Sequence, residues 1–223
     1  MSEHRDVYAG TLDGLRLLAQ RDLLAWWKQA EGLGFISQKE LLVEPFAAIV
    51  RTYGEQDAYA AADYLFLERS LDDSLRELEY PEVAEPVAFE QARGSFVSAM
   101  WVDDVEDASA RALALRKLQG IANRLVAEPA RKTVGLATLK AGTRYARVPE
   151  PGACSFCLML GSRGAVYSSK TALGTMGRYH DNCRCLAIEV KTDADLLRIN
   201  RDLMKLSETF NREFGGAADV EDW

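Results

Sequence analysis

The 223-residue chain is poor in several residue types that would mark a specialised class of protein. It has four cysteines and two histidines, and none of its apolar runs approaches the roughly 20 residues that a membrane-spanning helix needs. The opening stretch MSEHRDVYAG lacks the apolar core of a secretory signal. We therefore expect a protein made in the cytoplasm and without membrane contact. In a reducing compartment, metal-binding or catalytic cysteines are more common than structural disulfides.

Signatures of catalysis are also scarce. The sequence has neither an HExxH motif nor the HxE and PCxxC pair of nucleobase deaminases. A Ser/His/Asp triad needs a free histidine, whereas His4 lies at the chain end and His180 lies among cysteines. The weak alternative is a Ser/Lys arrangement that uses Ser168 or Ser169 with Lys170. The sequence therefore favours a non-enzymatic protein, with no catalytic residue assigned.

Acidic side chains are nearly missing from the middle of the chain. The formal net charge is −7, yet residues 129–180 carry eight basic side chains and the single acid Glu150. A basic segment between acidic flanks is typical either of a solvated surface or of a docking site for nucleic acid or an acidic protein. The candidate anion-binding or partner-binding residues are Arg131, Lys132, Lys140, Arg144 and Arg147.

The apolar pattern predicts a helical region over residues 1–141. Apolar residues recur at three- and four-residue steps over about 11–32, 37–71, 87–101, 104–126 and 129–142. Ser37 and Glu40 fit a capping box at the start of the second segment. Because proline disrupts a helix interior, we expect Pro45 and Pro129 close to helix starts.

The pattern changes after residue 142. Alternating residues, the glycines Gly152, Gly161 and Gly164, and the stretch CRCLAIEV predict a compact β-rich module over 142–191. Helical spacing returns from Leu196 to Phe210, which indicates a helix within 192–214 that packs back on the others, followed by a flexible acidic tail over 215–223. The predicted fold is mainly α with a small β-rich module, in the α+β class.

Every cysteine of the chain lies in this module. Cys154 and Cys157 form a CxxC motif, and a HxxCxC motif follows, which gives five donors for the four positions of a tetrahedral zinc site: Cys154, Cys157, His180, Cys183 and Cys185. The first choice of ligands is Cys154, Cys157 and Cys183, with His180 and Cys185 competing for the fourth position. Four protein ligands make a structural zinc site. Disulfides or a metal-free cluster are the alternatives.

Two stretches of the module resemble a known family. ARVPEPGACSFCLMLGSRGAVYSS and RYHDNCRCLAIEV are similar to the signature of the bacteriophage Mu F-like minor head proteins. The similarity is strongest to the actinobacteriophage type, often labelled capsid maturation protease. It covers roughly Arg144 to Val190, and the CxxC and HxxCxC elements are its most specific parts.

The resemblance implies a low-copy protein that acts in head morphogenesis. Its expected partners are the portal protein, the major capsid protein or a scaffold protein, with DNA as a further partner of the basic segment. It would act in the host cytoplasm during assembly and then reside in the virion, inside the capsid or at the portal vertex. Two alternatives stay open: a capsid maturation protease, and a metal-stapled DNA-binding protein unrelated to phage.

Overall fold

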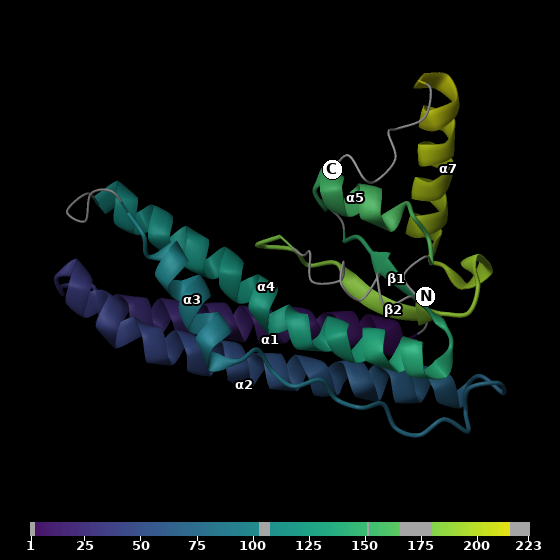
Figure 1. Ribbon diagram of the computed structural model, residues 1–223, viewed down its shortest axis with the longest axis horizontal. Helices are drawn as coiled ribbons and strands as arrows, with labels where there is room; N and C mark the ends of the chain where they lie inside the picture. The colour runs from purple at the N-terminus through teal and green to yellow at the C-terminus, as the bar shows by residue number, and fades with distance from the viewer. Residues whose placement is uncertain (1–2, 103–107, 151, 166–179, 215–223) are drawn as a thin grey trace.

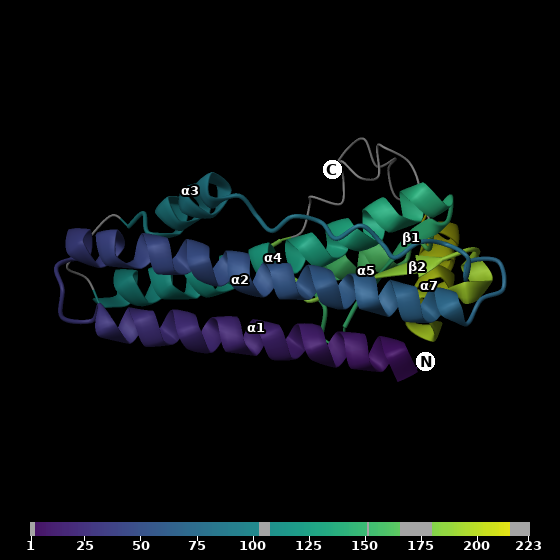
Figure 2. The same cartoon turned by 90° about the horizontal axis from the view of Figure 1, so that it is seen from below.

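Three long helices form the body of the molecule in the computed structural model, which describes residues 3–102, 108–150, 152–165 and 180–214. These are α1 (Glu3–Gln29), α2 (Phe35–Ser70) and α4 (Ala108–Ala141), and they lie side by side (Figure 2). The shorter α3 (Phe89–Ala99) packs on α2 and α4. With the small sheet described next, this confirms the predicted class of a mainly α protein with a small β module.

The rest of the chain forms a module at one end of α4 (Figure 1). Strands β1 (Arg144–Val148) and β2 (Leu186–Val190) pair antiparallel, with Arg144 opposite Val190 and Val148 opposite Leu186. The sheet packs on α4. Helix α5 (Ser155–Gly161) follows β1, and the 3-10 turn η1 (Asp193–Asp195) leads into α7 (Arg198–Phe214). Helix α7 packs against α5 and projects away from the three long helices (Figure 1).

The expected helix breaks at two prolines were wrong. Pro45 lies well inside α2, and Pro129 lies well inside α4, which merges two predicted segments into one 34-residue helix. Each proline removes one backbone hydrogen bond. The helices continue because each buries one long apolar face against its neighbours, and this burial stabilises far more than one bond.

The predicted capping box at Ser37 was also wrong, because α2 begins two residues earlier at Phe35 after Gly34. Thr192 and Asp195 form a capping box at η1. The apolar pattern over 104–126 begins at Asp104, a residue type that favours the N-cap, and this residue lies outside the described residues.

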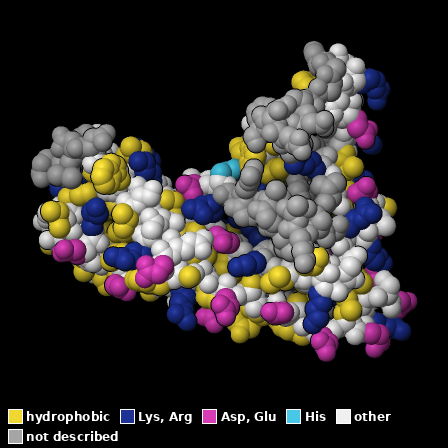
Figure 3. Space-filling view, viewed as in Figure 1, with side chains coloured by type: hydrophobic (Ala, Val, Ile, Leu, Met, Phe, Trp, Pro, Cys, Tyr) yellow, Lys and Arg dark blue, Asp and Glu magenta, His cyan; other side chains and the backbone are white. Residues whose placement is uncertain are grey.

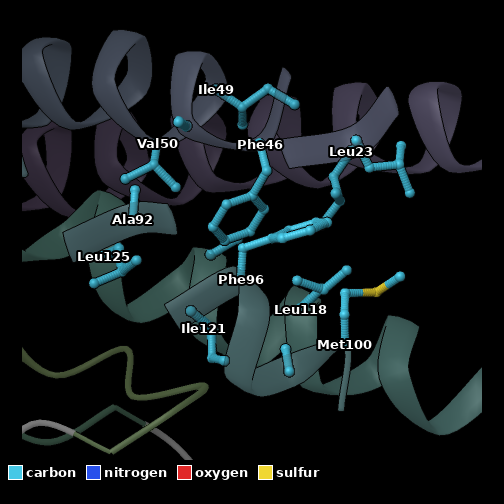
Figure 4. Close-up of a cluster of buried hydrophobic side chains, with 14 of the residues drawn as sticks. Leu23, Phe46, Ile49, Val50, Ala92, Phe96, Met100, Leu118, Ile121 and Leu125 are labelled. Atoms are coloured by element: carbon cyan, nitrogen blue, oxygen red, sulfur yellow. The ribbon is translucent and has the colours of Figure 1, made fainter. Parts of the chain in front are cut away.

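Two apolar cores lie along the bundle. The first joins α1, α2, α3 and α4, where the Phe46 and Phe96 rings stand 5.5 Å apart (Figure 4). The second joins the opposite ends of these helices to the sheet through residues such as Tyr145, Ile188 and Leu65. The module is therefore built on the same three helices as the bundle.

An ion pair reinforces the second core. The Arg69 guanidinium of α2 donates to both Glu189 carboxylate oxygens of β2 at 2.8 Å, and it also donates to the Ala137 carbonyl of α4. The Thr143 hydroxyl donates to the same carboxylate. Because both charges are buried and matched by hydrogen bonds, this pair fixes the position of the sheet on the bundle.

Candidate functional site

The first half of the cysteine cluster stands at the start of α5. Cys154 is the N-cap residue and Cys157 lies in the first turn, so both sulfurs point to the same side of the helix start. The turn before it depends on Gly152, whose φ of 80° favours glycine. Helix α5 was not predicted, because seven residues are too few to give a helical pattern.

The second half is a tight turn that precedes β2. The backbone N–H of Cys183 donates to the His180 carbonyl at 3.1 Å, and Asn182 takes a φ of 63°. We expected Cys183 and Cys185 on a strand, but β2 begins only at Leu186. Both cysteines are nevertheless buried with Cys157 in one cluster.

The turn rests on α4 at a glycine. The backbone N–H of Asn182 donates to the Gly120 carbonyl at 3.1 Å, and a side chain at Gly120 would meet Asn182 at 2.8 Å. Arg124 pairs with Asp181 at 2.8 Å beside this contact. Helix α4 therefore positions the HxxCxC half, while β1 and α5 position the CxxC half.

The five sequence-predicted donors come together. His180 Nε2 lies 3.0 Å from Cys154 Sγ and 3.1 Å from Cys157 Sγ, and Cys157 Sγ lies 3.6 Å from Cys183 Sγ. Two sets share Cys157, and within each set the donor atoms lie within 4.8 Å of one another: Cys154, Cys157 and His180, then Cys157, Cys183 and Cys185. The arrangement can hold a metal ion.

All four cysteines are free. The 3.6 Å between Cys157 and Cys183 far exceeds the roughly 2.05 Å of a disulfide bond. In this structure the cluster is therefore a set of thiols beside an imidazole, which favours the metal-binding prediction over the disulfide alternative.

Hydrogen bonding within the cluster divides the four thiols, because it lowers the pKa of Cys154 and Cys183 while the pKa of Cys157 and Cys185 is raised. The Cys157 backbone N–H, together with the Cys157 and His180 side chains, lowers the pKa of the Cys154 thiol. The Cys157 and Cys185 side chains lower the pKa of the Cys183 thiol, and the Arg131 guanidinium adds to this effect. Thiolates are the form of cysteine that ligates metals.

A frame of charged side chains holds the cluster against α1 and α4. Arg131 of α4 is buried and donates to the Cys183 and Cys185 carbonyls at 2.7 and 3.3 Å. Arg184, between these cysteines, pairs with Asp13 of α1 at 2.9 Å and with Glu150 at 3.1 Å. Sequence reasoning missed Asp13 and Arg184, since nothing in their local sequence distinguishes them from solvated surface charges.

The predicted basic residues do not gather on one surface. Arg131 and Arg147 are buried, and Lys140 pairs with Glu79 at 3.4 Å, while Lys132 and Arg144 are exposed on different elements. On the face seen in Figure 3, basic and acidic side chains are interspersed along the bundle. The two buried arginines are corrections to the expected docking surface: Arg131 donates hydrogen bonds to backbone carbonyls inside the molecule, and Arg147 is only 2% exposed.

The other candidates lie outside the described residues. Ser168, Ser169 and Lys170 fall within 166–179, and the acidic tail falls within 215–223. Across the described chain, no helix combines the length and the apolar character needed to cross a membrane.

Comparison with known protein families gives a match over nearly the whole chain. The family described as VG15 protein matches residues 2–212. Comparison with the curated proteins and with the solved structures gave no match.

Proposed function

Since this chain belongs to the VG15 protein family, a phage-derived family of viral proteins, we propose that it is a minor head protein that acts in head morphogenesis. It docks on the portal or on the inner capsid, first in the host cytoplasm during assembly and then in the virion. The family supports the phage origin, and the surface of α7 supports the docking role.

Helix α7 carries an apolar strip that stays largely exposed in the described chain. Ile199 and Leu206 stand seven residues apart, at helical spacing, and 42 and 66% of their surface is exposed. The same helix uses a different face to pack on the module, through buried Asn200 and half-buried Met204. A helix that packs on the module with one face and exposes apolar side chains on another fits a partner protein on the exposed face. This strip is the observation that carries the proposal.

The metal centre supports the docking role by fixing the base of α7. We take the ion to be zinc, because three thiolates with an imidazole, or four thiolates, form a structural zinc set. Around a tetrahedral zinc ion, sulfurs at about 2.3 Å from the metal stand roughly 3.8 Å apart, and the 3.6 Å between Cys157 and Cys183 agrees with this spacing. The ion would hold α5 against the HxxCxC turn, and α7 packs on α5.

The docking proposal is tested by reconstituting procapsids with and without changes to the strip. Leu206→Glu places a charge on an exposed position, so the fold stays intact while incorporation of the protein into procapsids falls at least about tenfold, as for loss of an interface anchor. Glu208→Lys on the exposed side of the same helix is the matched control. Unchanged incorporation of Leu206→Glu, measured by quantitative mass spectrometry of purified procapsids, would remove the proposal.

The zinc proposal is tested separately, by elemental analysis of protein purified under reducing conditions. We expect about one zinc per chain, and we expect thiols that react only after a chelator is added. Removing the ion should expose residues 153–165 and 180–190 to hydrogen exchange while the amides of α1 and α2 stay protected. A metal-free sample with four reactive thiols would contradict the zinc assignment.

A further inference from the structure

The cluster offers one donor more than a tetrahedral ion accepts. Cys157 is shared between two sets, so the remaining four donors divide into an outer pair, Cys154 and His180, and an inner pair, Cys183 and Cys185. The outer pair reaches the surface and the inner pair is buried, with only 1–2% of its surface exposed. The fourth ligand of a single metal ion could therefore come from either the outer pair or the inner pair.

His180 is already oriented as a ligand. Its Nδ1 lies 2.7 Å from the Asp181 carbonyl, and because a carbonyl only accepts, Nδ1 carries the proton. The lone pair of Nε2 is then free, and it faces Cys154 Sγ and Cys157 Sγ at 3.0 and 3.1 Å. A hydrogen bond from the non-ligating nitrogen to a carbonyl is the usual support for a metal-bound histidine.

Cys185 is held in place independently of His180. Its carbonyl accepts from Arg131, and the next residue, Leu186, begins β2 and pairs with Val148. Its sulfur lies within 4.8 Å of the Cys157 and Cys183 sulfurs. Loss of the imidazole therefore leaves Cys185 where it stands, and loss of Cys185 leaves the hydrogen bond that orients His180.

From this geometry we infer that His180 and Cys185 are interchangeable fourth ligands of one metal centre, with Cys154, Cys157 and Cys183 common to both forms. This inference rests on the proposed metal centre, and it specifies which residues ligate the metal ion. A borderline ion such as zinc takes the imidazole form, and a softer ion such as Cd²⁺ takes the form with four thiolates. The centre can then change its fourth ligand while three sulfurs keep the module closed.

The test is a Co²⁺ titration of the full chain, under reducing and oxygen-free conditions, with His180→Ala, Cys185→Ser and the double variant. Cobalt replaces zinc and reports its ligands: visible bands mark tetrahedral geometry, and near-ultraviolet absorption grows with the number of thiolates bound. His4→Ala is the matched control for loss of a histidine, because His4 lies on α1 beside Glu68.

Each single variant should bind one tetrahedral Co²⁺ with an affinity within about tenfold of the unmodified chain, and the double variant should lose at least about a hundredfold. The near-ultraviolet band should be stronger in His180→Ala than in Cys185→Ser. The inference is overturned when either single variant loses as much affinity as the double variant while far-ultraviolet circular dichroism shows intact helices. Cys185→Ala, measured beside Cys185→Ser, separates ligation from packing at this buried position, since both variants should keep tetrahedral binding.

A different outcome would contradict the proposed metal centre rather than the exchange of its ligands. If the unmodified chain gives no tetrahedral Co²⁺ spectrum, the metal centre itself is wrong. If the unmodified chain gives a tetrahedral Co²⁺ spectrum but the variants do not bind as expected, the metal centre is supported and the exchange of its fourth ligand is wrong.

Discussion

Arg131 joins the bundle to the cysteine cluster through one side chain. It leaves α4 in the middle of the bundle and donates to the carbonyls of Cys183 and Cys185. The sequence placed it in a basic surface, because a composition count cannot distinguish a solvated arginine from one that lies 3% exposed beneath a turn. Only the helical phase of α4 in three dimensions reveals the difference.

Replacing Arg131 should therefore destabilise the folded protein far more than replacing its neighbour. Arg131→Met leaves two buried carbonyls without their donor and should lower the free energy of unfolding by about 3 kcal/mol. Lys132→Met, at the adjacent exposed position, should change it by less than about 0.5 kcal/mol. Urea unfolding of both variants measures these changes, and equal effects would contradict the bridging role of Arg131.

Two glycines provide a second comparison at this scale. A Cβ at Gly161 would stand 2.7 Å from Pro149 Cδ, and the proline ring has nowhere to move, so Gly161→Ala should cost about 1–3 kcal/mol. A Cβ at Gly14 of α1 would have no described neighbour within 4 Å. Gly14→Ala should stabilise α1 by about 0.5–1 kcal/mol, since alanine favours helix. Thermal unfolding gives both values, and a destabilised Gly14→Ala would show that this face of α1 has a partner.

At the scale of elements, the two internal prolines differ in what surrounds them. Pro45 is half-buried in α2, whereas Pro129 is buried in α4 and faces Gly54, where a Cβ would meet its ring at 3.3 Å. The close approach of α2 and α4 at this point depends on glycine on one side and a flat ring on the other.

Substitution of the prolines should separate these effects. Pro45→Ala restores the backbone donor to the Leu41 carbonyl and should stabilise the protein by about 1–3 kcal/mol. Pro129→Ala restores the corresponding bond but empties the space beside Gly54, so its gain should be at least about 1 kcal/mol smaller. Differential scanning calorimetry of the two variants checks the order, and a larger gain at Pro129 would exclude a packing role for its ring.

The elements also show how far sequence reasoning reached. Apolar periodicity over many turns located α1, α3 and α7, and the spacing of CxxC and HxxCxC brought five donors to one place. The sequence-based prediction was wrong at Pro45 and Pro129, because a local rule about proline does not include the stabilisation that a long helix gains by burying one face. It also missed α5, which has too few residues for periodicity, and Asp13, whose partner Arg184 is 171 positions away in the chain.

At the scale of the whole molecule, the interior of the bundle contains a titratable carboxyl group. Asp57 of α2 is fully buried, and neither of its carboxylate oxygens has a hydrogen-bond partner among the described residues. Burial raises the pKa of Asp57 to about 8, although Arg16 and Arg131 oppose this effect and Asp13 adds to it. Between about pH 4 and pH 8, the Asp57 carboxyl is therefore protonated in the folded chain. In the unfolded chain, where its pKa is about 3.9, it has already lost this proton.

Stability should consequently fall as the pH rises from about 4 to about 8, by at most about 1.4 kcal/mol per pH unit from this group. Asp57→Asn removes the group, so the difference in unfolding free energy between this variant and the parent should grow across the window. Glu55→Gln, at an exposed position of the same helix, should leave the slope unchanged. Urea midpoints at several pH values provide the measurement, and parallel curves for Asp57→Asn and the parent would show that Asp57 keeps its charge when folded.

Helix α2 spans 36 residues without interruption, which corresponds to about 54 Å at 1.5 Å per residue. The sheet and α7 lie toward one end of the bundle, and α3 lies toward the other (Figure 1). Under the proposed docking role, the length of the helices would fix the distance between partner proteins bound at the two ends of the bundle. Under the proposed function, the chain would act as a spacer whose length is set by its helices, and shortening α1, α2 and α4 by equal numbers of turns would shorten that spacing by about 5.4 Å per turn.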